Sequence, residues 1–314
     1  MSNPSFQPPE SAGDLSRSPR LPGSAWAREK RFADVLGRRM AYIERGAGHP
    51  IVFLHGNPTS SFLWRNVLPH VEAPGRRLIV PDLIGMGDSD KIPAGAEPDR
   101  YRLAGHARYL GAFIDEVAGT ETLTLVLHDW GGALGFDWAY RHQERARAIA
   151  YMETFVAPLT LDDLPESFRP TLKAVRSPAG EALVLDENLF IEKMLPAVTQ
   201  RALSAEEMAE YRRPFLAPGD DRWPTLQWAR EVPLSGEPAD VRDRVAAYSA
   251  WLATAPLPKL FIDAEPGVFI TGRMKRMASS FPHQHRVVVK GLHFVQEDSP
   301  DEVGRAIADW LEQI

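Results

Sequence analysis

The chain has 314 residues and no cysteine, which excludes disulfides, thiolate metal sites and a cysteine nucleophile. Its composition, 44% hydrophobic and 25% charged, is that of a globular protein long enough to build a large core. The formal net charge of -6 argues against nucleic acid or an anionic membrane as a partner. No apolar run approaches the roughly 18 residues of a membrane span, and no secretory signal is recognisable, so we expect a cytoplasmic protein.

The first part of the chain alternates turn signals and strands. Residues 1–27 are rich in Pro, Ser and Gly, and are predicted to form a flexible extension. Residues 31–36 and 39–44 alternate in polarity around Gly37, which indicates an antiparallel hairpin. Strand and helix patterns then alternate, which favours a right-handed parallel α/β sheet. The predicted strands cover residues 51–54, 78–80, 123–127 and 146–152, and the predicted helices cover 103–117 and 133–142.

The α/β pattern is interrupted by a segment without strong strands. Prolines divide residues 157–233 into short helical pieces, and Ser204 followed by Glu207 is a capping-box pattern. The α/β pattern resumes with strands at 259–262 and 286–289 and a last helix over 300–314. We therefore predict a core domain over 28–155 and 234–314, with an inserted helical cap over 156–233.

The motif His128-Asp-Trp-Gly-Gly132 directly follows the predicted strand 123–127. A strand, small residues and then a helix form the layout of a nucleophile elbow, whose usual occupant is Ser. Here Asp129 takes that position. A carboxylate can attack an electrophilic carbon without an activating base, and it leaves an ester on the enzyme.

Four polar sites fall at predicted strand ends, where reactive groups collect in such sheets. They are Asn57, Asp129 with Trp130, Glu153 and His293, in the chain order nucleophile, acid, histidine. The indole of Trp130 and the amide of Asn57 are neutral donors, which suit a halide leaving group. An alkoxide would instead need an acid such as Tyr.

The same residues account for the second step. His293 takes a proton from water, and Glu153 holds the imidazole and stabilises its cation. Backbone N–H groups of Trp130 and Asn57 are the natural donors to the oxyanion that forms on the carboxyl group of Asp129. His293 works only as a neutral base, so we expect activity to fall as the pH drops through its pKa.

From about Phe32 to the C-terminus, the chain resembles the haloalkane dehalogenases. The resemblance is closest to the subfamily with an Asp-Glu-His triad and Asn and Trp halide ligands. It is carried by the motifs His55-Gly-Asn-Pro-Thr-Ser60, Asp82-Leu-Ile-Gly-Met-Gly-Asp-Ser89, His128-Asp-Trp-Gly-Gly132, Tyr151-Met-Glu153 and Leu292-His-Phe-Val-Gln-Glu-Asp298. It implies the α/β-hydrolase fold: a mostly parallel eight-stranded sheet with helices on both faces and an inserted helical cap.

The resemblance also implies roles and partners. Asp129 would be the nucleophile, His293 the base, Glu153 the acid, and Asn57 and Trp130 the halide ligands. The partners would be a small halogenated hydrocarbon, a halide ion and water, with no metal or organic cofactor. The chain would be a monomer or a weak homo-oligomer.

In this family the cap supplies an apolar pocket. The candidate lining residues, by position, are Phe155, Leu164, Leu172, Phe190, Val198, Leu292 and Phe294. Val198 stands where a larger residue is common, which predicts a wider tunnel. Ala229 stands where close relatives carry Pro beside the halide, which predicts a weaker halide contact.

One residue competes with Glu153 for the role of triad acid. Asp263 follows a predicted strand after which many α/β-hydrolases place that acid. We favour Glu153, because two carboxylates near one imidazole would raise each other's pKa unless one turned away.

Three other functions compete with dehalogenation. An epoxide hydrolase shares the Asp nucleophile, but its cap should supply two Tyr acids, and Tyr211 is the only Tyr between Glu153 and Pro233. A luciferase-like oxygenase acting on a coelenterazine-type substrate resembles the same subfamily. A non-enzymatic binding protein on this fold would have no reason to keep Asp129, Glu153 and His293.

Overall fold

The computed structural model describes residues 23–314, so most of the predicted flexible extension lies outside the described residues. For residues 23–27 that prediction is wrong, because they belong to helix α1 (Gly23–Arg28). Trp26 is fully buried, and its indole N–H donates to Ser61 Oγ over 3.1 Å. Burying one large aromatic side chain helps to order a short helix, and the average composition of the segment conceals this.

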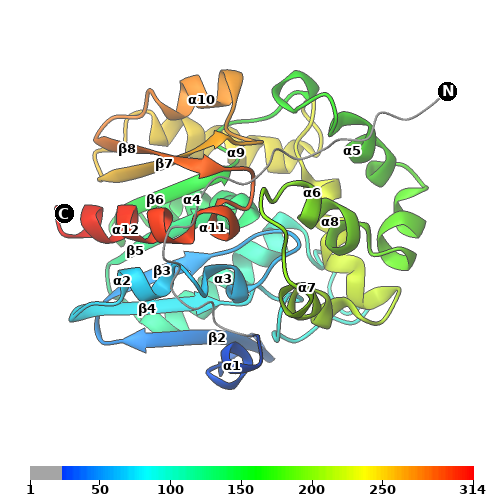
Figure 1. The fold of residues 1–314 in the computed structure, drawn as a ribbon, viewed down its shortest axis with the longest axis horizontal. Helices are drawn as coiled ribbons and strands as arrows, with labels where there is room; N and C mark the ends of the chain where they lie inside the picture. The colour runs from blue at the N-terminus through cyan, green and yellow to red at the C-terminus, as the bar shows by residue number, and fades with distance from the viewer. Residues whose placement is uncertain (1–22) are drawn as a thin grey trace.

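Eight strands of the described chain form one sheet in the order β1-β2-β4-β3-β5-β6-β7-β8 (Figure 1). The pairings of β1 with β2 and of β2 with β4 are antiparallel, and the remaining pairings are parallel. The mostly parallel sheet and its antiparallel hairpin are thus confirmed. The strands are β1 (Arg31–Val35), β2 (Arg38–Gly46), β3 (Gly48–Leu54), β4 (Gly75–Pro81), β5 (Leu123–His128), β6 (Ala146–Thr154), β7 (Lys259–Pro266) and β8 (Gln284–Gly291).

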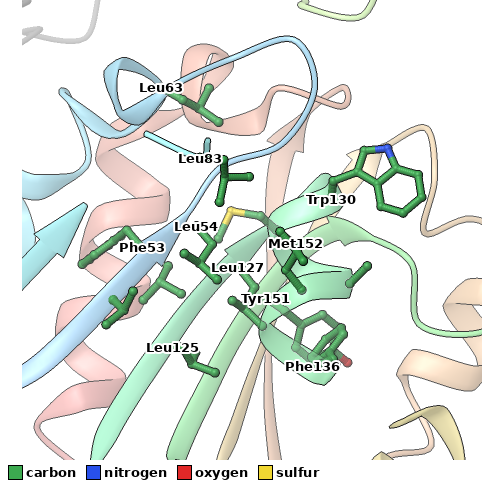
Figure 2. Packing of buried hydrophobic residues seen from close by; sticks show 14 of the residues in the cluster. Phe53, Leu54, Leu63, Leu83, Leu125, Leu127, Trp130, Phe136, Tyr151 and Met152 are labelled. Carbon is green, nitrogen blue, oxygen red and sulfur yellow. The ribbon is translucent and has the colours of Figure 1, made fainter. Parts of the chain in front are cut away.

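The central strands form the core because helices cover both of their faces. Every residue of β5 is buried, which explains its continuous apolar run. Figure 2 shows side chains of β3, β5 and β6 packed against one another, with Trp130 at one end of the cluster. The buried core therefore reaches directly to the end of β5, where the nucleophile elbow was predicted.

The helices outside the predicted cap surround this sheet. Helices α2 and α12 contact each other, whereas α3, α4 and α9 form a second contacting group. Helix α12 crosses the front of the sheet in Figure 1. The bounds are η1 (Ser61–Trp64), α2 (Leu68–Val71), α3 (Leu103–Ala118), α4 (Asp129–Arg141), α9 (Ala239–Leu252), α10 (Gly272–Ala278), α11 (Val295–Asp298) and α12 (Pro300–Leu311). No helix of the described chain is long and apolar enough to cross a membrane.

Residues 156–233 form short helices that lie together at one end of the sheet (Figure 1). The predicted capping box is confirmed, because Ser204 Oγ accepts from the N–H of Glu207 and Glu207 accepts from the N–H of Ser204. The segment contains η2 (Leu161–Asp163), α5 (Arg169–Arg176), the π-helical turns η3 (Ala182–Asp186) and η4 (Phe190–Met194), α6 (Leu195–Ala197), α7 (Ala205–Arg212), η5 (Arg213–Phe215), η6 (Asp220–Arg222) and α8 (Trp223–Glu231). The domain boundaries stay a prediction.

Candidate active site

Asp129 lies at the sharp turn between β5 and α4, in a left-handed backbone conformation with φ of +51°. Neighbouring chain segments approach it closely. A Cβ atom on Gly56 would lie 2.0 Å from Asp129 Oδ1, and one on Gly132 would lie 1.8 Å from Thr154 Oγ1. The hydroxyl of Thr154 donates to the carbonyl oxygen of Asp129 over 2.6 Å. Glycine is therefore required beside this strained turn, which presents the carboxylate at the end of the strand.

His293 lies between two carboxylates. Its Nε2 is 3.4 Å from Asp129 Oδ2, and its Nδ1 is 3.4 Å from Glu153 Oε2. Glu153 is the last residue but one of β6. Its carboxylate is held by three backbone N–H groups that follow β7, those of Val268, Phe269 and Ile270, at 2.9, 2.9 and 3.2 Å. The loop after β7 thus fixes the carboxylate that orients the imidazole.

The three groups are coupled electrostatically. Burial alone would lower the pKa of His293, but hydrogen bonds and charges from Asp129 and Glu153 raise it to about 9. Burial alone would raise the pKa of Asp129, but the hydrogen bond and charge of His293 hold that pKa below its usual value. At neutral pH, Asp129 is therefore an anion and His293 is a cation.

Asp263, the competitor for the acid role, lies elsewhere. It is fully buried and pairs with the guanidinium of Arg286 and with Lys275 Nζ, the latter at 3.0 Å. The structure therefore brings Glu153 to His293 and turns Asp263 toward two cations.

The two predicted halide ligands flank Asp129. The backbone N–H of Asn57 donates to Asp129 Oδ1 over 2.7 Å, and Asn57 Nδ2 donates to the carbonyl oxygen of Thr225 in α8 over 3.2 Å. The indole of Trp130 is buried against Phe155 and Trp228, with ring centroids 4.6 Å away in each case. Both residues therefore lie beside Asp129 at the same end of the sheet and line the same cavity.

These residues line one cavity under the cap, with about 600 Å³ of space that is partly open to solvent. Asp129, Trp130, Asn57 and His293 form its polar part. Six of the predicted apolar residues also line it, namely Phe155, Leu164, Leu172, Phe190, Val198 and Phe294. The prediction is wrong for Leu292, which is absent from the lining and packs on the hydrophobic core.

Comparisons with known proteins agree with this geometry. A family model described as alpha/beta hydrolase fold matches residues 49–300. A haloalkane dehalogenase of Sphingobium indicum is 53% identical over 287 residues, covering 91% of this chain and 96% of that protein. The chain belongs to the haloalkane dehalogenase family. The crystal structure of haloalkane dehalogenase DbeA from Bradyrhizobium elkani is 40% identical, with a TM-score of 0.85, and the match covers 90% of this chain and 97% of that one.

The oxygenase alternative also has a relative. A coelenterazine h 2-monooxygenase of Renilla reniformis is 42% identical over 293 residues, which is 92% of each chain. The dehalogenase of Sphingobium indicum is more similar, at 53% identity. The family resemblance stated from the motifs is therefore confirmed on the dehalogenase side.

Several residues that line the cavity of this dehalogenase family member were not predicted from the sequence. Phe269 follows β7, and its ring centroid lies 4.5 Å from that of His293. Phe168, Met194 and Leu195 come from the cap, where no regular period indicates which side faces inward. For Phe269, the signal was its place after a strand that ends near the triad. Residues 23–314 contain no group of three His, Asp or Glu that could hold a metal ion.

Proposed function

We propose that this protein hydrolyses haloalkanes to an alcohol, a halide ion and a proton through an ester on Asp129. One observation carries the proposal. The carboxylate of Asp129 lies in an apolar cavity, beside the neutral donors Asn57 and Trp130 and 3.4 Å from the imidazole of His293. An apolar cavity accepts a haloalkane, and neutral donors bind the departing halide without adding a positive charge that would weaken the nucleophile.

The first step is an in-line displacement. An oxygen of the Asp129 carboxylate forms a bond to the carbon that bears the halogen, and the carbon–halogen bond breaks. The halide leaves with the electron pair and takes hydrogen bonds from the indole of Trp130 and the amide of Asn57. The leaving group needs no proton, so this step uses no general acid.

The second step releases the alcohol. A water molecule gives its proton to Nε2 of His293 and attacks the carbonyl carbon of the ester on Asp129. The resulting oxyanion lies near the backbone N–H of Asn57, which donates to Asp129 Oδ1 over 2.7 Å in the free protein. Collapse breaks the bond between the carboxyl carbon and the alcohol oxygen, which takes the proton from Nε2 of His293. The carboxyl group of Asp129 then loses to solvent the proton that it gained with the water oxygen.

The ester can be trapped by removing the base. In His293→Ala, 1-bromobutane should release about one bromide per enzyme, and the peptide that contains Asp129 should gain the mass of a butyl group. The control is the double variant His293→Ala with Asp129→Asn, which should release no bromide and gain no mass. A wild-type protein that releases no bromide, together with a His293→Ala protein without the adduct, would sink the proposal.

The cavity also distinguishes the alternatives. Tyr211, the tyrosine that an epoxide hydrolase would need, donates its hydroxyl proton to Glu297 and is not part of the cavity lining. The monooxygenase relative makes coelenterazine oxidation the second candidate. Oxidation of that substrate without any bromide release would favour it. Two expectations from the sequence stay predictions: that the protein is a monomer or a weak homo-oligomer, and that it is cytoplasmic.

A further inference from the structure

Cap helix α8 contacts both predicted halide donors. Its Trp228 stacks on the indole of Trp130, with ring centroids 4.6 Å apart and an angle of 23° between the planes. The carbonyl oxygen of Thr225, three residues earlier, accepts the hydrogen bond from Asn57 Nδ2. Residues three apart lie on the same face of a helix, so one turn of the cap meets the two side chains that the core supplies.

The stack continues beyond Trp228. Its indole also stacks on the ring of His106 in α3, with centroids 4.0 Å apart and an angle of 18°. His106, Trp228 and Trp130 are at most 2% exposed. Burial lowers the pKa of His106 to about 3, so its ring is neutral. Neither ring nitrogen of His106 has a hydrogen-bond partner within residues 23–314, so packing holds the ring in place without hydrogen bonds.

Both contacts restrict a donor that would otherwise be free to turn. An indole N–H donates in the plane of its ring, so stacking that fixes the plane also fixes the direction of donation. The amide of Asn57 has two N–H bonds, and giving one to Thr225 leaves the other for an anion. If the amide of Asn57 were flipped, its oxygen would face the carbonyl oxygen of Thr225, and the hydrogen bond between them would be lost.

We propose that α8 positions the halide site, with Trp228 orienting the indole of Trp130 and the Thr225 carbonyl orienting the amide of Asn57. Trp228 is then a positioning residue, since it is not part of the cavity lining. The proposal rests on the halide site of the proposed function. It makes the cap a determinant of leaving-group affinity as well as a wall of the substrate pocket.

The test measures halide binding without turnover. Sodium bromide is titrated at constant ionic strength, and the midpoint of tryptophan fluorescence quenching is compared between variants. Trp228→Leu should raise the midpoint about tenfold, the upper range for an aromatic pair, whereas Trp228→Phe should raise it less than about threefold. The midpoint, unlike the amplitude, does not depend on how many tryptophans report.

A matched control separates positioning from stability. Trp138 lies in the same helix as Trp130, is 4% exposed and stacks on His142 at 4.8 Å, away from the cavity. Trp138→Leu should lower the thermal midpoint as Trp228→Leu does, but leave the bromide midpoint unchanged. If Trp228→Leu also leaves the bromide midpoint unchanged, the proposal is overturned.

A second pair of variants leaves α8 intact. His106→Leu removes the outer ring of the stack, and His106→Phe keeps one. We expect the bromide midpoint to rise about threefold in the first and to stay unchanged in the second. Equal midpoints in both would overturn the role of the stack, even if Trp228→Leu fails to fold.

The role of α8 in holding both donors is tested by combining variants. If part of the effect of Trp228→Leu passes through Asn57, its effect on the midpoint should be smaller in an Asn57→Ala background. If the two variants multiply each other's effect on the bromide midpoint exactly, Trp130 and Asn57 are held independently. That result would overturn the proposal that α8 positions the two donors together. If the wild-type protein neither binds bromide nor releases it from 1-bromobutane, the proposed function fails and the inference fails with it. If instead the wild-type protein binds bromide and the variants bind it equally well, the inference about α8 fails while the proposed function stands.

Discussion

The charge of Asp129 controls the proton on His293. With Asp129 ionised, the pKa of His293 is raised to about 9, so the free protein carries an imidazolium at neutral pH. In the proposed mechanism, alkylation turns this carboxylate into a neutral ester and removes one of the two anions beside the ring. The pKa of His293 then falls, and the ring becomes a base when the ester needs hydrolysis.

This sequence of events predicts separate pH dependences for the two steps. Asp129→Asn imitates the neutral ester, so NMR titration of His293 should give a pKa well below about 9 in that variant. In the wild-type protein, the bromide burst should stay constant from pH 5 to 8, while the steady-state rate falls on the acid side. If the pKa of His293 stays near 9 in Asp129→Asn, the charge of Asp129 does not control the proton on His293.

The identity of the acid can be decided by two isosteric changes. Glu153→Gln removes the second anion beside His293 and should reduce kcat by on the order of 10³-fold or more. Asp263→Asn should keep kcat within about threefold and reduce the free energy of unfolding by about 1–3 kcal/mol, because it leaves Arg286 and Lys275 without their buried partner. If only Asp263→Asn abolishes turnover, the assignment of Glu153 is wrong.

Among the helices and strands, those with a regular hydrophobic period could be predicted from the sequence. The apolar residues of α3 recur at helical spacing, and the predicted helix over 103–117 agrees with Leu103–Ala118. The cap contains π-helical turns at Ala182–Asp186 and Phe190–Met194, which have no hydrophobic period of their own. Its inward-facing side chains depend on packing against the core. Helix α1 was not predicted, because it is held by the burial of a single residue, Trp26, and a single residue makes no periodic pattern.

A buried charge network joins the cap to the segment that carries His293. Arg65 after η1 bonds Glu297 of α11 at 2.9 Å and Glu207 of α7 at 2.7 Å, and Arg201 pairs with both carboxylates. Burial would raise the pKa of Glu297, but the charges of Arg65 and Arg201 hold it below its usual value. Glu297 is four residues beyond His293, so this network also supports the active-site turn.

Breaking the network should be costly. Glu297→Gln leaves Arg65, which is fully buried, without its main counter-ion, and should reduce the free energy of unfolding by about 3–5 kcal/mol. Urea unfolding measures this. Glu312→Gln is the control, because Glu312 is 75% exposed and 3.9 Å from Arg76, so its loss should change stability by less than about 0.5 kcal/mol. Equal effects of the two changes would show that the network is not holding the fold.

For the whole molecule, topology explains why the site was easier to predict than its walls. Asn57 and Asp129 follow strands β3 and β5, and Glu153 lies in the last two residues of β6. These strands are adjacent and parallel, so their carboxyl ends meet. A sequence that places polar residues at such ends therefore places them together. Leu292 could not be assigned in this way, because its neighbour His293 faces the cavity while it packs on the core. Which neighbour of a catalytic residue faces inward depends on the backbone turn.

The buried histidines give the whole fold a characteristic pH dependence. Burial is the largest influence on the pKa values of His55, His106 and His128, which are lowered to about 4, 3 and 3 from an ordinary value of 6.5. Their unfolded forms take up protons below about pH 6.5, but their folded forms do not until about pH 4. As the pH falls across that window, the unfolded chain binds up to three more protons. The free energy of unfolding then falls by up to about 4 kcal/mol per pH unit.

His293 acts in the opposite direction and makes stability fall as the pH rises above 6.5. Because its folded pKa is about 9, the folded protein binds one more proton than the unfolded chain between pH 6.5 and 9. Stability from this group is complete below pH 6.5 and is lost as the pH rises, at up to about 1.4 kcal/mol per pH unit. Urea unfolding from pH 4.5 to 8 should therefore give a maximum near pH 6.5, and the range stops at pH 8 because burial lowers the pKa of Lys91 and Lys259 to about 8. His106→Phe should flatten the acid side by about a third and leave the alkaline side unchanged, since it removes one of the three protons. A stability that stays level between pH 5 and 6.5 would mean that these histidines do not remain neutral in the folded protein.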